Sequence, residues 1–185
     1  MIGLCSPVMG SGKTTVAEYL VRNHGFIRLS VASTLKAMTR TFLEESGMNP
    51  YDAAEIIADP ELKEMPLKAL NGKTPRYAMQ TLGTEWGRTL FGEDFWINAA
   101  INKAKSLMSQ GYSVVFDDVR FTNEAEAIVA NLGCMVRVER PGVSAAPTDH
   151  PSEGQLNDYP CAYRIINFST PAVLEVEVAN LMKHF

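Results

Sequence analysis

Residues 1–15 read MIGLCSPVMGSGKTT, and this stretch decides the fold. Its first five residues form a short apolar run of the kind that makes a buried strand. A glycine-rich turn follows and ends in Gly-Ser-Gly-Lys-Thr-Thr at positions 10–15, and residues 16–22 have the composition of a helix. This order predicts a phosphate-binding P-loop, because its backbone N–H groups and the helix N-terminus both attract an anion.

Residue types within the loop indicate a nucleotide with its metal. Lys13 is expected to reach the β- and γ-phosphates, and the Thr14 hydroxyl to bind Mg²⁺. Pro7 stands where the motif normally has its first glycine, and a residue without an N–H alters the entry turn more than the phosphate cradle. The alternative is a strand-to-helix turn with a solvated lysine. The predicted ATP-binding residues of the loop are Gly10, Ser11, Gly12, Lys13, Thr14 and Thr15.

The composition is that of a single globular domain without a strong overall charge. The chain has 185 residues, 46% of them hydrophobic and 21% charged, and a chain of this length buries about 70% of its surface on folding. A net charge of −4 provides no basic field for nucleic acid or an anionic membrane. The three widely spaced cysteines suit a reducing cytosol. No run approaches the roughly 18 apolar residues that span a bilayer, so a cytoplasmic protein is expected.

Alternating strand and helix patterns predict a parallel sheet. We expect an α/β fold of the P-loop NTPase type, with three layers, about five parallel strands and helices on both faces. The expected strands are 1–5, 26–31, 112–116, 135–139 and 162–168, and the helices that accompany them are 16–22, one that begins near Ser33, 123–132 and 171–182.

Two segments depart from this alternation. Residues 44–108 contain short charged helical pieces at 52–57 and 61–70 and longer helical patterns at 76–90 and 94–108, and they predict a helical substrate-binding insertion. Residues 142–160 are small, polar and without periodicity, which is typical of a functional loop and predicts a lid. The predicted core of the single domain is therefore about 1–43, 109–141 and 161–185.

Two carboxylates and an arginine follow the strand at 112–116. Asp117 and Asp118 come at its carboxyl end, where parallel α/β sheets bind ligands. We favour Asp118 over Asp117 as the acid near Mg²⁺, with capping of the next helix as the alternative. Arg120 is placed to bind a phosphate bidentately, with a structural ion pair as the alternative.

A second polar group lies on the helical pattern at 76–90. Arg76, Gln80, Glu85 and Arg88 fall at intervals of four, five and three residues, which places them near one helix face. A substrate wall and an exposed, salt-bridged surface explain this face equally well.

Several separated stretches together resemble the bacteriophage-type deoxynucleoside monophosphate kinases, a family of P-loop nucleotide kinases. The likeness covers nearly the whole chain, and its departures are Pro7 and Ser33-Thr34, where an acidic-proline pair is expected. The matching stretches are 10–15, Ala-Ser-Thr-Leu-Lys at 32–36, Arg76 with Gln-Thr-Leu-Gly-Thr-Glu-Trp-Gly-Arg at 80–88, Phe-Trp at 95–96, Asp-Val-Arg-Phe at 118–121, Asn-Glu at 123–124, Arg-Pro-Gly at 140–142 and His-Pro-Ser-Glu at 150–153.

The resemblance implies transfer of the ATP γ-phosphoryl group to a deoxynucleoside 5′-monophosphate, with Mg²⁺, giving ADP and a dNDP. It implies ATP and a dNMP as the partners, no polymeric nucleic acid and no membrane, and a host cytoplasm if the chain is viral; it leaves a homodimer open. His150, Ser152 and Glu153 match the family without a physical role that we can assign. The implied roles are transfer for Lys13, Arg120 and Arg140, ATP binding for Arg137 besides the loop, acceptor binding for Lys36, Arg76, Gln80, Arg88, Asp118 and Arg120, and metal binding for Thr14 and Asp118.

Two other functions fit parts of the sequence. A kinase with a hydroxyl acceptor, of the nucleoside or dephospho-coenzyme A type, would use Asp117 or Asp118 as a general base. An ATPase or nucleotide-dependent switch without an acceptor would explain the loop and the carboxylates but leave the arginines without a function.

Overall fold

The computed structural model describes residues 1–8, 10–142, 154–168 and 170–184. The chain divides into two compact units, which we call the sheet unit (Met1–Val31 and Ile97–Phe185) and the helical unit (Ala32–Trp96). The boundaries differ from the predicted ones. Helix α2 (Ser33–Glu45) belongs to the helical unit rather than to the core, and all but the first two residues of α5 (Phe95–Ser109) belong to the sheet unit.

The sheet unit contains a fully parallel five-stranded sheet in the order β2-β3-β1-β4-β5. Strand β1 lies at its centre, and Ile2 of β1 is paired with Val115 on one side and Cys134 on the other. Every residue of β1 and β3 is buried, which is why these strands read as continuous apolar runs. The predicted fold class is confirmed. The strands are β1 (Ile2–Cys5), β2 (Ile27–Leu29), β3 (Val114–Phe116), β4 (Cys134–Glu139) and β5 (Tyr163–Ile166).

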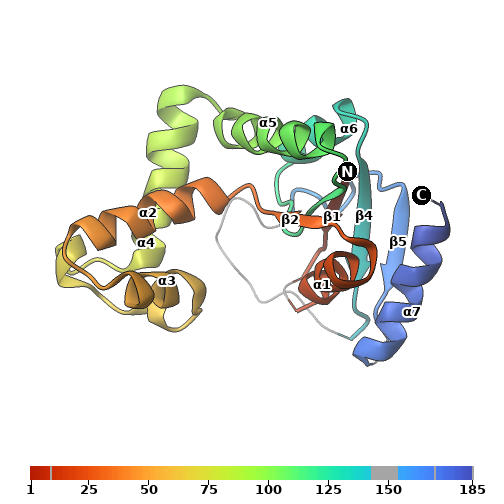
Figure 1. Ribbon diagram of the computed structural model, residues 1–185, viewed down its shortest axis with the longest axis horizontal. Coiled ribbons are helices and arrows are strands. Elements are labelled where there is room, and N and C mark those ends of the chain that lie inside the picture. Colours follow the sequence, from red (N-terminus) through yellow and green to blue (C-terminus); the bar gives the residue numbers. More distant parts are fainter. Residues whose placement is uncertain (9, 143–153, 169, 185) are drawn as a thin grey trace. The chain divides into compact units, whose positions relative to one another are not determined.

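Helices cover both faces of this sheet (Figure 1). On one face, Leu4 and Val136 belong to a core shared with α1 (Lys13–His24) and α7 (Pro171–Leu181). On the other face lies α6 (Thr122–Ala130). A Cβ on Gly3 would lie 2.9 Å from Cδ1 of Ile128 in α6, so glycine lets this helix approach the sheet closely.

The helical unit has its own small core, which Leu43, Ala53 and Ile57 form. Its helices α3 (Pro50–Ala58) and α4 (Pro75–Thr81) begin in the same way, with a side-chain N-cap followed by proline, a combination that favours helix initiation. The prediction of a helix at 61–70 was wrong. Two 3₁₀ turns, Leu62–Glu64 and Lys68–Leu70, replace it, because Pro66 lacks the N–H that a continuous helix needs.

The segment predicted as one helix at 76–90 contains two types of helix. The α-helix α4 is followed directly by a π-helix, η3 (Leu82–Thr89). The Trp96 indole Nε1 donates a hydrogen bond to the Gly83 carbonyl at 2.8 Å. Gly87 provides the space, because a Cβ there would lie 2.2 Å from Trp96 Nε1. A side chain that takes a carbonyl from the i→i−4 ladder is a recognised cause of such rewinding, and sequence periodicity did not reveal it.

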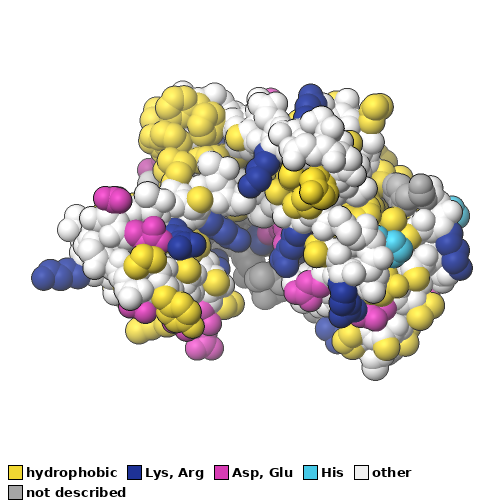
Figure 2. All heavy atoms as spheres, in the orientation of Figure 1, with side chains coloured by type: hydrophobic (Ala, Val, Ile, Leu, Met, Phe, Trp, Pro, Cys, Tyr) yellow, Lys and Arg dark blue, Asp and Glu magenta, His cyan; other side chains and the backbone are white. Residues whose placement is uncertain are grey.

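The surface over η3 is apolar. Trp86, Leu90 and Phe91 are all exposed, and the Trp86 and Phe91 rings pack together with centroids 4.8 Å apart. Figure 2 shows this apolar group at the upper left, and elsewhere on that face the cationic and anionic side chains are interspersed. Within the described ranges, no helix combines the length and apolar character needed to cross a membrane.

Candidate nucleotide site

The predicted P-loop joins β1 to α1. Gly12 precedes α1 with a φ of 107°, and a Cβ there would lie 2.8 Å from Asn167 Nδ2, so both the backbone and the available space require glycine. The N-cap of α1 is this glycine, which has no side chain to cap the helix. A helix N-terminus attracts an anion through its amides and its dipole, and Lys13 and Thr14 are the first two residues of α1.

The turn into the loop is held by Ser6. The Ser6 hydroxyl donates to the Val8 carbonyl at 2.9 Å and accepts from the Val8 N–H at 3.2 Å. These two contacts bracket Pro7, which has no N–H of its own to stabilise the turn. Pro7 stands in place of the usual glycine, and the Ser6 side chain stabilises the turn at the entry to the loop.

Asn167 directly follows β5, and its side chain stabilises the P-loop. The sequence did not indicate this role. Its side-chain Nδ2 donates to the Ser11 carbonyl at 2.9 Å, and its backbone N–H donates to the Glu139 carbonyl at 2.7 Å. Asn167 is buried. It therefore couples the P-loop to the end of the sheet, and only the pairing of β1, β4 and β5 brings these distant residues together.

The two carboxylates after β3 have different environments. Asp117 is buried, and its Oδ2 accepts a hydrogen bond from Arg28 Nε at 2.5 Å. Its Oδ1 is buried without a hydrogen-bond partner in the described part of the chain. An orphaned buried carboxylate oxygen calls for a water or an ion, so Asp117 has the feature that we expected of Asp118.

Asp118 and Arg120, for which we predicted metal and phosphate binding, pair with each other. Arg120 Nε donates to Asp118 Oδ2 at 2.7 Å. The buried Glu124 carboxylate accepts from the backbone N–H groups of Arg120 and Phe121, at 3.0 and 3.3 Å. Glu124 thereby fixes the backbone on which Arg120 is mounted, which gives this residue of the family-like stretch a structural role.

The two arginines of β4 and its C-terminal extension lie in different settings. Arg140 is exposed, and its Nη1 donates to the Gly10 carbonyl at 3.3 Å, which places a predicted transfer residue beside the P-loop. Arg137 is buried and donates to the Leu156 and Tyr159 carbonyls, both at 2.7 Å. Arg137 thus anchors the chain before β5, and its contact with ATP stays a prediction.

Only the end of the predicted lid at 142–160 is described. Leu156 is buried there, and the Arg137 contacts attach residues 156–159 to the sheet. His150, Ser152 and Glu153 lie outside the described residues. The prediction that this segment is a lid is therefore untested.

The helical unit holds the predicted acceptor residues Lys36, Arg76, Gln80 and Arg88. Arg76 is exposed and forms an ion pair with Glu64. Burial lowers the pKa of the half-buried Lys63, and the positive charges of Lys36 and Arg76 lower it further. Lys63 therefore lies near two predicted residues, and the carboxylates of Asp59 and Glu64 also act on it and raise its pKa. It belongs to a segment whose charges gave no functional signal.

Comparison with known proteins agrees with this geometry. No protein-family model matches the chain. The chain is 33% identical over 161 residues to a protein of Acanthamoeba polyphaga mimivirus named "Putative deoxynucleotide monophosphate kinase", and the match covers 80% of this chain and 77% of that protein. The chain belongs to the deoxynucleotide monophosphate kinase family. The predicted family resemblance is thereby confirmed.

A solved structure shares the fold of this family member. The dephospho-CoA kinase from Campylobacter jejuni superposes with a TM-score of 0.51 at 14% sequence identity, and the match covers 99% of this chain and 95% of that one. The structural likeness supports the P-loop kinase fold, which the strand order and the loop also indicate. Because the sequence identity is so low, the likeness gives no information about the acceptor.

The oxygen donors of this kinase fit Mg²⁺. Magnesium prefers oxygen ligands, and nucleotide-dependent enzymes bind it through one or two side chains together with substrate phosphates. Thr14 at the start of α1 and the orphaned Oδ1 of Asp117 are such donors. The described residues contain no group of three or more His, Cys, Asp or Glu side chains that would hold a metal without a nucleotide.

The support from Asn167 leads to a prediction about this kinase. Asn167→Ala removes the hydrogen bond to Ser11 and leaves the Ser11 carbonyl without it. A hydrogen bond of this type contributes about 0.5–1.5 kcal/mol, so we expect the dissociation constant for ATP to rise by about 2- to 10-fold. Calorimetric titration with Mg-ATP measures it. Asn180→Ala, on α7, is the control and should bind ATP as the unmodified protein does; equal affinities for all three proteins would contradict the role of Asn167.

Proposed function

We propose that this protein transfers the γ-phosphoryl group of ATP to a deoxynucleoside 5′-monophosphate. The observation that carries the proposal is the sequence likeness to a protein named as a deoxynucleotide monophosphate kinase. The N-terminus of α1, which begins at Lys13 directly after Gly12, supports binding of the ATP phosphates in the sheet unit. The cations Lys36, Lys63 and Arg76, which lie near one another beside the carboxylates of Asp59 and Glu64, support binding of a second anion in the helical unit.

The chemistry of a monophosphate acceptor fits these residue types. The second pKa of a phosphate monoester is about 6, so the attacking oxygen is already an anion at neutral pH and needs no strong general base. The main requirement is to neutralise and align two polyanions. We assign Lys13 and Arg140 to the transferring phosphate. Thr14 and the carboxylate of Asp117 or Asp118 would hold Mg²⁺, which neutralises charge on the phosphates when it is bound.

The acceptor phosphate and base are assigned to residues of the helical unit. Lys36, Arg76 and Lys63 are the cations that we assign to the acceptor phosphate, and Gln80 is the candidate reader of a base edge through its amide. Arg88 of the same unit belongs to this assignment, and the acceptor roles of Asp118 and Arg120 in the sheet unit stay predictions from the family likeness. A location in the cytoplasm and a homodimer stay predictions.

Lys63 gives this assignment a specific prediction. Lys63 Nζ donates to the Ala58 carbonyl at 3.2 Å, which leaves two of its three donors for an anion. Lys63→Ala is expected to raise KM for the dNMP by about 10-fold, since a hydrogen bond to a charged group contributes roughly 1.5–3 kcal/mol before solvent screening. KM for ATP should stay within twofold.

Steady-state kinetics with each substrate varied in turn separate the two constants. Lys68→Ala is the matched control, because Lys68 is an exposed lysine of the same unit that does not contribute to the lowered pKa of Lys63. An unchanged dNMP KM in Lys63→Ala, or an equal rise in Lys68→Ala, would remove Lys63 from the acceptor site.

One observation favours a second candidate, a kinase with a hydroxyl acceptor. The buried Asp117 has an oxygen without a partner among the described residues, and a hydroxyl acceptor needs such a carboxylate as a base. The interaction of Asp117 with Arg28 stabilises the carboxylate but also occupies its other oxygen. The choice of acceptor therefore decides between the two functions.

A side-by-side acceptor assay tests the proposed function. ADP formation from Mg-ATP is measured with each dNMP, each NMP, the nucleosides, dephospho-coenzyme A and no acceptor. Turnover confined to monophosphates is the expected result and names the accepted bases. Turnover with a hydroxyl acceptor would transfer the conclusion to the second candidate, and equal ADP formation without any acceptor would indicate an ATPase or switch.

A further inference from the structure

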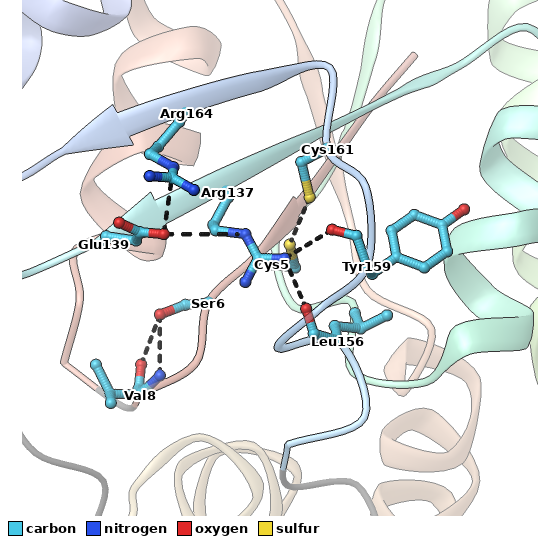
Figure 3. A network of polar contacts seen from close by, with 9 residues as sticks. All are labelled: Cys5, Ser6, Val8, Arg137, Glu139, Leu156, Tyr159, Cys161 and Arg164. Carbon is cyan, nitrogen blue, oxygen red and sulfur yellow. Dashed lines mark hydrogen bonds and ion pairs between the residues drawn. The ribbon is translucent and has the colours of Figure 1, made fainter.

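Two of the three cysteines lie together at the base of the P-loop (Figure 3). Cys5 is the last residue of β1 and is buried, whereas Cys161 precedes β5 and is partly exposed. Their sulfur atoms are 3.4 Å apart. The sequence separates these residues by 156 positions, and the return of the chain toward β5 brings them into contact.

A buried positive charge is fixed beside this pair. The Arg137 guanidinium lies next to the Cys5 sulfur in Figure 3 and is held by the Leu156 and Tyr159 carbonyls. Its Nε is 4.0 Å from Glu139 Oε1, and Glu139 also pairs with Arg164. Because two neutral carbonyls orient Arg137 and the Glu139 carboxylate is shared with Arg164, much of the positive charge of Arg137 can stabilise a thiolate.

The two thiols consequently differ in acidity. A hydrogen bond from Cys5 lowers the pKa of Cys161 to about 6, with further lowering by Arg137 and Arg164 against the effect of burial. The same hydrogen bond and burial raise the pKa of Cys5. Burial raises the pKa of Cys134, the third cysteine. The partly exposed Cys161 is therefore the more acidic thiol of the pair, and the buried Cys5 is the less acidic one.

We propose that Cys5 and Cys161 form an oxidisable pair, in which Cys161 reacts with hydrogen peroxide and Cys5 closes a disulfide. The Cys161 thiolate attacks one peroxide oxygen, the O–O bond breaks, and the departing hydroxide takes a proton to become water, which leaves a sulfenic acid on Cys161. Cys5 then loses its proton and attacks the Cys161 sulfur. The S–O bond breaks, and the departing hydroxide and the Cys5 proton form a second water.

The geometry suits this second step. A disulfide requires a sulfur–sulfur bond of about 2.0 Å, and the two sulfur atoms, 3.4 Å apart, are already in contact. The bond would join the residue before the P-loop turn to the segment that Arg137 anchors. Bond formation needs no nucleotide, so its test is independent of the proposed function.

Peroxide treatment of the reduced, folded protein tests the proposal. Hydrogen peroxide is added and removed, the protein is denatured, and free thiols are alkylated before mass spectrometry and peptide mapping. We expect one alkylated cysteine, Cys134, and a peptide pair linked through Cys5 and Cys161 whose mass returns to that of the free thiols after dithiothreitol. Three alkylated cysteines, or a disulfide that includes Cys134, would overturn the proposal.

Serine variants separate the two roles. Cys134→Ser is the matched control and should form the same disulfide at the same rate. Cys5→Ser should instead retain the sulfenic acid on Cys161, which dimedone captures, and Cys161→Ser should give no disulfide within the chain. Dimedone capture at Cys5 in Cys161→Ser, with none at Cys161 in Cys5→Ser, would reverse the assigned order and contradict the proposal. If a variant folds poorly, the disulfide mapping of the unmodified protein still tests whether Cys5 and Cys161 form the oxidisable pair.

Discussion

Lys13→Ala is expected to lower kcat/KM of the phosphoryl transfer by at least about 100-fold. Lys13 is the first residue of α1, directly after the left-handed Gly12, where its ammonium can follow the phosphate charge from substrate to transition state. Removing one such electrostatic contact typically costs about 10²–10³-fold in rate. Initial rates of ADP formation with a dNMP at saturating ATP measure the effect on kcat, and rates at low ATP measure kcat/KM.

Lys183→Ala is the matched control for this substitution. Lys183 is an exposed lysine of the same unit, and its Nζ donates to Asn180 Oδ1 at the C-terminal end. Its removal should leave both kinetic constants unchanged. Transfer that survives Lys13→Ala with the same kcat/KM would exclude the P-loop from the reaction and with it the nucleotide site described above.

The largest expected effect on stability comes from Gly87→Ala. The added methyl group would lie 2.2 Å from Trp96 Nε1, so the indole must move and its hydrogen bond to the Gly83 carbonyl is lost or distorted. Overpacking costs about 1–3 kcal/mol and the lost hydrogen bond about 1 kcal/mol. We expect the free energy of unfolding of the helical unit to fall by roughly 2–4 kcal/mol, measured by urea denaturation followed through tryptophan fluorescence.

Gly83→Ala provides the contrast within the same π-helix. A Cβ there would lie 3.7 Å from Leu35 Cδ2, which is ordinary van der Waals contact, and alanine favours a helical backbone over glycine by about 1 kcal/mol. This variant should be as stable as the unmodified protein or slightly more stable. If both variants unfold at the same urea concentration, the close fit of Trp96 against Gly87 does not hold the π-helix.

Sequence patterns predicted the sheet well because its signals are local. The apolar runs at β1 and β3 reflect strands buried on both faces, and Gly12 marks a backbone conformation that few other residues adopt. The π-helix was missed, since the hydrogen bond from Trp96 to Gly83 that accompanies it joins residues 13 positions apart, and no periodicity within 82–89 encodes that contact.

The site was harder to predict wherever partners are distant in sequence. Asp118 was favoured over Asp117 as the acid near Mg²⁺, and this assignment stays a prediction. The sequence does not show that Asp117 is buried against Arg28, 89 positions away, with one oxygen that has no partner in the described ranges. Asn167 and Arg137 gave no signal of a structural role, since their contacts with Ser11 and Leu156 depend on the packing of the sheet unit. Lys63, which we propose for the acceptor site, gave no signal because one charge in a charged segment resembles its neighbours.

The central claim is that the γ-phosphoryl group moves from ATP to a nucleoside monophosphate, and the fate of that group tests it most directly. ATP labelled with ³²P in the γ position is incubated with the protein, Mg²⁺ and the dNMP that gives the fastest ADP formation, and the products are separated by chromatography. We predict that the label appears in the dNDP, in an amount equal to the ADP formed. Label that appears only in inorganic phosphate would contradict the claim.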